Sequence, residues 1–99
     1  MIPPPVAGGA RKKAYVYLLK SRQDGTLYLG WTTNTLRRLV EHNAGQSPFT
    51  RRKHGWQLVG FETYQTSEQA KVRERALKHS SRMLTFFKKR MLNQAASGG

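Results

Sequence analysis

Hydrophobic residues gather in three short segments that have the pattern of β-strands. Residues 14–20, 26–31 and 56–64 are rich in tyrosine, tryptophan, valine and leucine. These residue types suit the pleated, half-buried surface of a sheet. The pattern predicts three strands, and the first two are close enough in sequence to pair directly.

Asp24 and Gly25 lie between the first two segments and favour a hairpin with a two-residue turn. Because side chains alternate between the two faces of a strand, the pairing set by this turn places Tyr17 and Tyr28 on the same face of the sheet. A shift of one residue would separate them. The hairpin therefore predicts that two phenols share one face.

The pattern becomes helical after Asn34, which is a good helix cap. Leu36, Leu39 and Val40 form an apolar stripe at helical spacing and predict a helix over about residues 35–43. Two more helices are expected in the C-terminal part. Thr66 or Ser67 is expected to cap the first of these, which runs to about Lys78. The second is a basic amphipathic helix from about Ser81 to Asn93, whose apolar residues are Met83, Leu84, Phe86, Phe87, Met91 and Leu92.

The predicted order is strand, strand, helix, strand, helix, helix. It indicates an α+β fold with a small, mainly antiparallel three-stranded sheet flanked by helices. A chain of 99 residues supports one domain. We expect a flexible N-terminal arm over residues 1–13, a folded domain over 14–93 and a flexible tail over 94–99, because both ends are rich in small residues, with glycine at both and proline in the arm.

The charge of the chain points to an anionic partner. It has 18 lysines and arginines against 5 acidic residues, a formal net charge of +13. The phosphate backbone of a nucleic acid is the usual partner of such a protein. An anionic membrane surface is the alternative, although no apolar run approaches membrane-spanning length. The N-terminus lacks the pattern of a signal peptide, so we expect an intracellular, cytoplasmic protein.

The residue inventory limits the chemistry. The chain has no cysteine, which excludes disulfides, thiolate zinc sites and cysteine nucleophiles. Its carboxylates are Asp24, Glu41, Glu62, Glu68 and Glu74, and its histidines are His42, His54 and His79. They are too few and too scattered for a two-metal cluster or a structural zinc site. One hard cation held by one carboxylate, with water and phosphate oxygens as the other ligands, is compatible with this composition.

Glu74 is the best candidate for that carboxylate. Ala70 and Leu77 lie four residues before it and three after it, so Glu74 is expected at the edge of the helix face that meets the core. The alternative is an exposed carboxylate paired with Lys71 or Lys78.

Arg38 and His42 lie four residues apart and therefore share a helix face. The guanidinium could hold a phosphate and the imidazole could carry a proton. Alternatively, Arg37 and Arg38 form a solvated face that contacts phosphate without catalysis. Tyr17 and Tyr28 could likewise only fill the sheet, and a phenol acts as a general base at neutral pH only if a cation helps to remove its proton.

Four motifs together resemble the GIY-YIG nuclease superfamily. They are YVY at 15–17, YLG at 28–30, RRLVEHN at 37–43 and SEQAKVRERALK at 67–78. Their order and spacing are most similar to the small single-domain members of the UPF0213 (YhbQ-like) type, over about residues 14–92. The resemblance implies a metal-dependent endonuclease that hydrolyses phosphodiester bonds with one Mg²⁺ or Mn²⁺ ion.

The resemblance also implies a role for each site residue. Tyr17 corresponds to the general base or proton relay, and Tyr28 to the tyrosine that orients water or substrate. Arg38 corresponds to the arginine that stabilises the scissile phosphate, His42 to a histidine one turn later, and Glu74 to the metal ligand.

The chain departs from the family pattern at several positions. Tyr15 replaces the glycine of the first motif, Leu29 occupies the middle of the second, and Asn93 lies outside any clear motif although larger members carry a late asparagine. Phe49 stands where small relatives commonly have tyrosine.

Small family members lack a separate DNA-binding domain, so the basic surface of the domain must bind the nucleic acid. The candidates are Arg37, Arg51, Arg52, Lys53, His54, Lys78, Arg82, Lys88, Lys89 and Arg90. Such contacts carry little sequence information, so cleavage is expected to depend on DNA structure, as in branched, nicked or single-stranded DNA, with a role in repair or recombination. A protein partner could add specificity.

Two other functions stay open. One is a weakly catalytic or non-catalytic module that binds DNA or RNA on the same fold, and the other is a basic structural protein without a site. The combination of Tyr17, Tyr28, Arg38 and Glu74 favours the enzyme, since a pure binding protein has no need of it.

Overall fold

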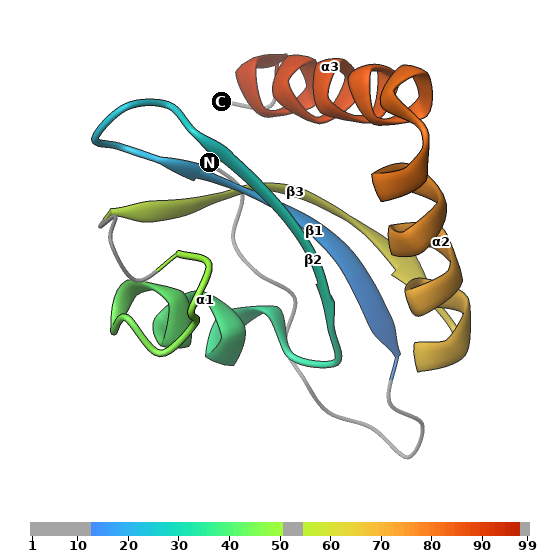
Figure 1. Cartoon of the computed structure of the whole chain (residues 1–99), viewed down its shortest axis with the longest axis horizontal. Helices are drawn as coiled ribbons and strands as arrows, with labels where there is room; N and C mark the ends of the chain where they lie inside the picture. Colours follow the sequence, from blue (N-terminus) through green and yellow to red (C-terminus); the bar gives the residue numbers. More distant parts are fainter. Residues whose placement is uncertain (1–12, 51–54, 98–99) are drawn as a thin grey trace.

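The computed structural model describes residues 13–50 and 55–97, and these form a three-stranded sheet with three helices (Figure 1). The elements are β1 (Ala14–Ser21), β2 (Leu27–Thr32), α1 (Thr35–Asn43), β3 (Trp56–Tyr64), α2 (Ser67–His79) and α3 (Ser81–Ser97). This order confirms the predicted α+β fold. The caps Asn34 and Thr66 accept hydrogen bonds from the backbone of the helices that follow them, as their sequence positions predicted.

The sheet is antiparallel, with β1 in the centre and the strand order β2-β1-β3. The prediction of a two-residue turn is wrong. Ser21 N–H donates to the carbonyl of Thr26 at 2.9 Å, so residues 22–25 form a longer loop that Gly25 closes with φ +76°. The Asp24 carboxylate accepts a hydrogen bond from the Thr26 backbone at 3.0 Å, which favours this wider loop.

The longer loop does not change which side chains share a face. Tyr17 pairs with Gly30, and Leu19 pairs with Tyr28. Since the register differs from the predicted one by two residues, Tyr17 and Tyr28 still lie on the same face. That part of the prediction is confirmed.

The helices cover the two faces of the sheet in separate layers. Figure 1 shows α1 on one side of the sheet, with α3 on the other and α2 at its side. The core on the α2 and α3 side contains Ala14, Val16, Leu18, Leu29, Val59, Ala70, Leu77, Phe87 and Met91. A smaller cluster on the α1 side contains Tyr17, Leu19, Trp56 and Leu58. The larger core therefore lies on the α2 and α3 side, and the smaller cluster lies under α1.

α1 does not bury its whole apolar stripe. Leu39 packs against the smaller cluster, whereas Leu36 and Val40 are 55% and 59% exposed. The buried residues of α1 are instead Thr35 and His42. α1 is turned about its axis so that His42, rather than Leu36 or Val40, is buried. Polar partners beneath the imidazole offset the free-energy cost of burying it.

The last helix is longer than predicted. α3 continues to Ser97, four residues past the expected end at Asn93. The added residues Gln94, Ala95, Ala96 and Ser97 include no helix breaker, and Ala95 packs against the main core. No helix in the described ranges is long and apolar enough to cross a membrane.

Candidate active site

The centre of the candidate site is the phenol of Tyr17, in the middle of β1 on the face that α1 covers. Its side chain is only 2% exposed. The ring lies over Gly30, its partner on β2. A Cβ atom at position 30 would lie 2.6 Å from Cζ of the ring and 3.0 Å from Cε2, as well as touching the hydroxyl. Only glycine leaves room for the phenol in this position.

α1 brings His42 to this phenol. The Tyr17 hydroxyl lies 2.9 Å from Nε2 of His42, and Nδ1 lies 2.6 Å from Oγ1 of Thr50. His42 is fully buried and Thr50 is 1% exposed. The three side chains therefore form one continuous hydrogen-bonded chain, Tyr17–His42–Thr50, away from bulk water.

Aromatic rings surround the imidazole. The Tyr28 ring lies 4.9 Å from the ring of His42, and the Trp56 ring lies 6.5 Å from it, measured between centroids. The rings of Tyr17 and Tyr28 are 6.4 Å apart. The predicted pair of phenols is thus part of a compact group that excludes solvent from His42.

The end of α1 and the segment after it are fixed to β3 by polar contacts. The backbone N–H of Trp56 donates to the side chain of Asn43 at 2.6 Å, and the Asn43 amide donates to the Trp56 carbonyl at 3.0 Å. The indole N–H of Trp56 donates to the Thr50 carbonyl at 3.2 Å. These contacts hold Thr50 in place beside His42.

The environment keeps the phenol of Tyr17 protonated at neutral pH. Burial raises its pKa well above the ordinary value, although a hydrogen bond and the positive charge of Arg38 oppose this. The neighbouring side chains of Tyr28 and Glu74 raise the pKa further. A general-base role for Tyr17 therefore needs a nearby cation or a proton acceptor.

His42 is the nearest proton acceptor. Burial lowers its pKa to about 4, helped by the charge of Arg38 and opposed by Glu41. The imidazole is neutral at pH 7 and keeps one lone pair for the hydrogen-bonded chain.

Arg38 and Glu74 come from different helices, and both influence the pKa of the Tyr17 hydroxyl. Arg38 is 35% exposed and donates a hydrogen bond to Glu41 at 3.1 Å, which holds its guanidinium beside Tyr17. Glu74 lies on α2 with 19% of its side chain exposed, and Lys78 is its ion-pair partner at 3.6 Å. Its position is consistent with both sequence interpretations, since it lies beside the buried Ala70 and Leu77 and yet pairs with Lys78.

The donor set fits a single hard cation better than a metal cluster. Within residues 13–50 and 55–97, no group of three or more acidic, histidine or cysteine side chains could hold an ion. Glu74 offers one partly exposed carboxylate, and this suits Mg²⁺ or Mn²⁺, because Mg²⁺ keeps several of its waters.

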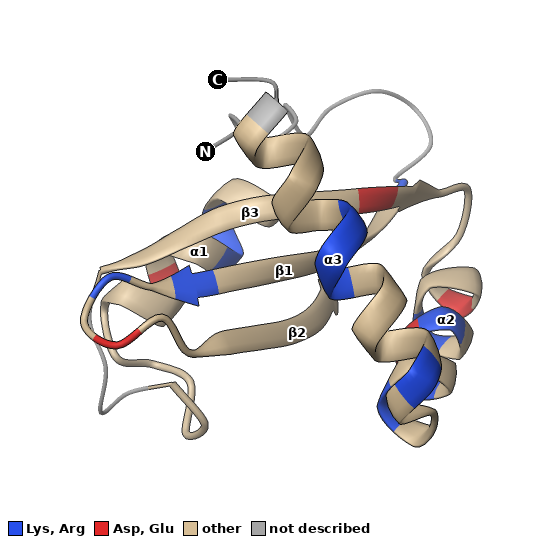
Figure 2. Cartoon of the chain, turned by 90° about the horizontal axis from the view of Figure 1, so that it is seen from above, with Lys and Arg blue, Asp and Glu red and all other residues tan. Residues whose placement is uncertain are grey.

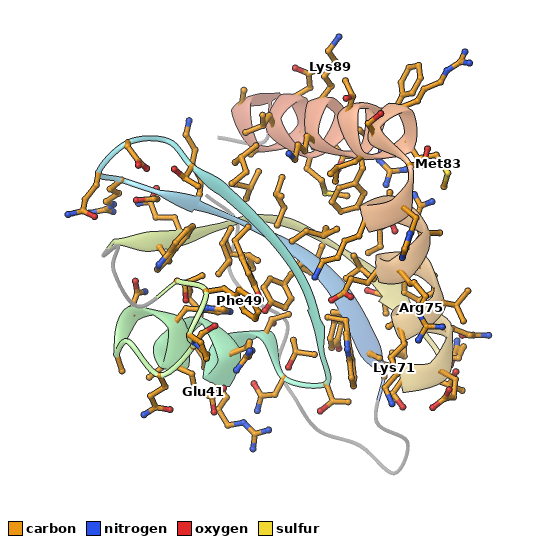
Figure 3. All side chains as sticks on the ribbon, in the orientation of Figure 1. Glu41, Phe49, Lys71, Arg75, Met83 and Lys89 are labelled. Carbon is orange, nitrogen blue, oxygen red and sulfur yellow. The ribbon has the colours of Figure 1, made fainter. Side chains whose placement is uncertain are left out.

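The predicted basic residues are divided between different parts of the fold. Arg37 is exposed on α1, and Lys78 adjoins Glu74. Arg82, Lys88, Lys89 and Arg90 belong to α3, across the sheet from α1, and Figure 2 shows basic residues along α2 and α3. In Figure 3, Lys89 and Glu41 lie on opposite sides of the sheet. Arg90 is paired with Glu62, and residues 51–54 lie outside the described part.

Two residues of the candidate site were not predicted from the sequence. Two positions that depart from the family pattern, Asn93 and Phe49, lie away from its centre. Thr50 contacts His42 and Gly30 contacts Tyr17. Gly30 belongs to the YLG motif but had no role assigned to it, and no pattern in the sequence marked Thr50. Asn93 lies on α3, in the layer opposite α1. Phe49 is 85% exposed beside Thr50, at the loop next to α1 (Figure 3).

Most of the chain matches known protein sequences. A family model described as the GIY-YIG catalytic domain matches residues 13–90. A UPF0213 protein of Haloquadratum walsbyi is 42% identical over 69 residues, which cover 69% of this chain and 76% of the relative. A UPF0213 protein of Lactiplantibacillus plantarum is 42% identical over 82 residues, 80% of each chain. One from Streptococcus pneumoniae is 38% identical over 71 residues, 71% of each. No solved structure gives a significant match.

Proposed function

We propose that this chain, which belongs to the GIY-YIG family and within it to the UPF0213 group, is a metal-dependent endonuclease that hydrolyses phosphodiester bonds in DNA. The family implies nuclease-type chemistry in general. The observation that carries the finer proposal is the buried Tyr17 hydroxyl, which His42 contacts at 2.9 Å and which the charges of Arg38 and Glu74 both influence.

Each residue contributes a separate part of the reaction. Arg38 binds the scissile phosphate and stabilises the negative charge that grows on it. Tyr17 takes a proton from the attacking water while its own proton passes to the neutral His42. Tyr28 orients the water or the substrate from the same face of the sheet.

Glu74 is the residue that would hold the divalent cation, with water and phosphate oxygens as the other ligands. When bound, such an ion supplies Lewis-acid stabilisation of the phosphate and lowers the pKa of a bound water. The single carboxylate at this position is consistent with one ion rather than two.

The substrate is held by charge rather than by base contacts. Arg37 and Lys78 lie on the helices that also carry Arg38 and Glu74, so they are the nearest described candidates for phosphate contacts. Arg82, Lys88 and Lys89 would bind more distant phosphates, and Arg51, Arg52 and Lys53 follow Phe49 in the sequence. Contacts of this kind recognise the backbone and favour recognition by DNA structure. Branched, nicked or single-stranded DNA, and a role in repair, fit this mode.

The proposal is tested by cleavage of linear, nicked, flapped, branched and single-stranded DNA, and of RNA, at low salt with Mg²⁺ or Mn²⁺. Tyr17→Phe and Glu74→Gln are compared with the parent protein. Glu68→Gln is the matched control, since Glu68 lies on the same helix with 81% of its side chain exposed. We expect the parent and the control to cut, and the two site variants to bind equally well without cutting.

The opposite result has an equally direct meaning. A parent protein that binds every substrate and cuts none, or site variants that cut as fast as the control, would contradict the enzyme. The chain would then be a nucleic-acid-binding module on a nuclease fold.

A further inference from the structure

We propose that Thr50 is a positioning residue that holds the ring proton of His42 on Nδ1. Its hydroxyl oxygen accepts a hydrogen bond from Nδ1–H, and Nε2 is thereby left as the acceptor for the hydroxyl of Tyr17. The contact itself is a property of the folded chain. Its importance for catalysis rests on the proposed function.

The geometry leaves two arrangements of the protons. Nε2 of His42 lies 2.9 Å from the Tyr17 hydroxyl, and Nδ1 lies 2.6 Å from Oγ1 of Thr50. Both distances are those of direct hydrogen bonds. A neutral imidazole has one N–H and one lone pair, so one neighbouring hydroxyl donates to the ring and the other accepts from it.

The acidity of the two hydroxyls selects between these arrangements. A phenol is a stronger hydrogen-bond donor than the aliphatic hydroxyl of threonine. Burial raises the pKa of Tyr17, but the hydrogen bond and the charge of Arg38 act against this and favour the phenol as the donor. Tyr17 therefore donates to Nε2. The ring proton is left on Nδ1, where the oxygen of Thr50 is the acceptor.

The position of Thr50 is fixed by its own backbone. Its N–H donates to the Ser47 carbonyl at 3.2 Å, and its carbonyl accepts from the indole of Trp56 at 3.2 Å. Thr50 is 1% exposed, so water does not readily replace its hydroxyl. The loop thus presents one oriented acceptor to His42. The hydrogen bond to Thr50 fixes the orientation of the imidazole ring, which the contact with Tyr17 alone would not do.

This arrangement has a consequence for the proposed reaction. As the attacking water gives a proton to the oxygen of Tyr17, the phenol proton moves to the lone pair of Nε2. The hydroxide formed attacks the phosphorus, the bond from phosphorus to one sugar oxygen breaks, and that leaving oxygen takes up a proton from solvent. His42 is then a cation whose Nδ1–H still donates to Thr50. With the opposite tautomer, Nε2 would already hold a proton and could not accept this one.

The direct test is long-range ¹H–¹⁵N NMR of the histidine rings in the metal-free protein at neutral pH, without DNA. The His42→Asn variant identifies the signals of His42. We expect a protonated Nδ1 and an unprotonated Nε2 in the parent protein and in Thr50→Ser. In Thr50→Val, which has the same shape without the hydroxyl, we expect the proton to be shared between the two nitrogens.

Two results would overturn the inference. One is a parent protein in which Nε2 carries the proton, and the other is a Thr50→Val variant with the tautomer of the parent. If Thr50→Val does not fold, as judged from its ¹H–¹⁵N amide spectrum, the parent and Thr50→Ser spectra still decide which nitrogen is protonated.

Cleavage kinetics then test the role of the contact in catalysis. We expect Thr50→Val to lower kcat at least about 10-fold with KM unchanged, and Thr50→Ser to restore most of the rate. A Thr50→Val variant with the rate of the parent would show that the contact only supports packing. If the parent protein and both variants cut no substrate, the proposed function fails, while the NMR result on the tautomer keeps its meaning.

Discussion

The phenol of Tyr17 rests directly on the backbone of Gly30, its partner on the neighbouring strand. The absence of a side chain at position 30 leaves room for the ring, whose hydroxyl lies 2.9 Å from Nε2 of His42. The glycine of the second motif is therefore a packing requirement of the tyrosine of the first motif. The two motifs are physically one unit.

Gly30→Ala tests this relationship. The new methyl group would overlap the buried ring of Tyr17, so the phenol must move from its place against His42. We expect the free energy of unfolding to fall by roughly 1–3 kcal/mol, and cleavage to fall at least about 10-fold. Urea unfolding and the cleavage rate measure the two effects.

Gly60→Ala is the matched control on the other face. A Cβ atom there would press against the side chain of Met91 rather than against a site residue. It should lower stability without reducing the cleavage rate of the folded protein. Equal losses of rate in the two variants would mean that Gly30 acts only through overall stability.

The sequence predicted the fold well because its local signals agree with one another. The strand segments, the caps Asn34 and Thr66 and the helical spacing all act over a few residues, so they can be recognised without tertiary information. The shared face of Tyr17 and Tyr28 was also predictable, since it depends only on whether the register is odd or even.

The partners of the site residues were not predictable in the same way. Thr50 reaches His42 because the loop after α1 folds back and is fixed by Trp56, and no local pattern encodes that contact. The rotation of α1 has the same origin. Leu36 and Val40 are exposed because His42 takes the buried position. This depends on the tertiary contacts of His42, which the spacing of the apolar residues does not encode.

The two arginines of α1 should differ sharply in function. Arg38 lies beside the Tyr17 hydroxyl, whereas the side chain of Arg37 is 69% exposed. Arg38→Lys keeps the charge and loses the planar fork that binds phosphate with two hydrogen bonds. We expect kcat to fall about 100-fold or more, with little change in DNA affinity.

Arg37→Lys serves as the control and should stay within about twofold of the parent in kcat. Both variants are measured under single-turnover conditions, so that product release does not mask the chemical step. Similar losses at the two positions would indicate that α1 contributes only general phosphate binding.

Glu62 should be a structural residue rather than a catalytic one. Burial alone would raise its pKa, but hydrogen bonds from Arg73, Tyr64 and Arg90 outweigh this and lower it. The carboxylate thereby joins β3 to α2 and α3, on the face away from Tyr17. We expect Glu62→Gln to lower the free energy of unfolding by about 2 kcal/mol, with kcat unchanged.

Glu68→Gln provides the comparison, because the Glu68 side chain is 81% exposed and its ion pair with Lys71 spans 3.5 Å. A solvated pair of this kind contributes less than about 1 kcal/mol. Urea unfolding at pH 7 measures both variants. A loss of cleavage in folded Glu62→Gln would require a second carboxylate in the site.

The buried imidazole predicts how stability depends on pH. The pKa of His42 is lowered to about 4 in the folded protein by burial and by Arg38, whereas an unfolded histidine titrates near 6.5. Between these values the unfolded chain binds a proton at position 42 that the folded chain does not. The free energy of unfolding must therefore fall as pH decreases from about 6.5 to 4, by about 3 kcal/mol in total.

The upper part of this window isolates His42. Glu62 also loses its stabilising effect in acid, but its lowered pKa confines that loss to pH values below its ordinary range near 4.5. Urea unfolding between pH 4.5 and 7 should thus show a slope in the parent protein that His42→Gln lacks. His79→Gln, a change at an exposed position at the end of α2, should keep the slope. If His42→Gln retained the slope of the parent, a group other than His42 would have to titrate on unfolding. The conclusion that His42 is buried and neutral between Tyr17 and Thr50 would then be wrong.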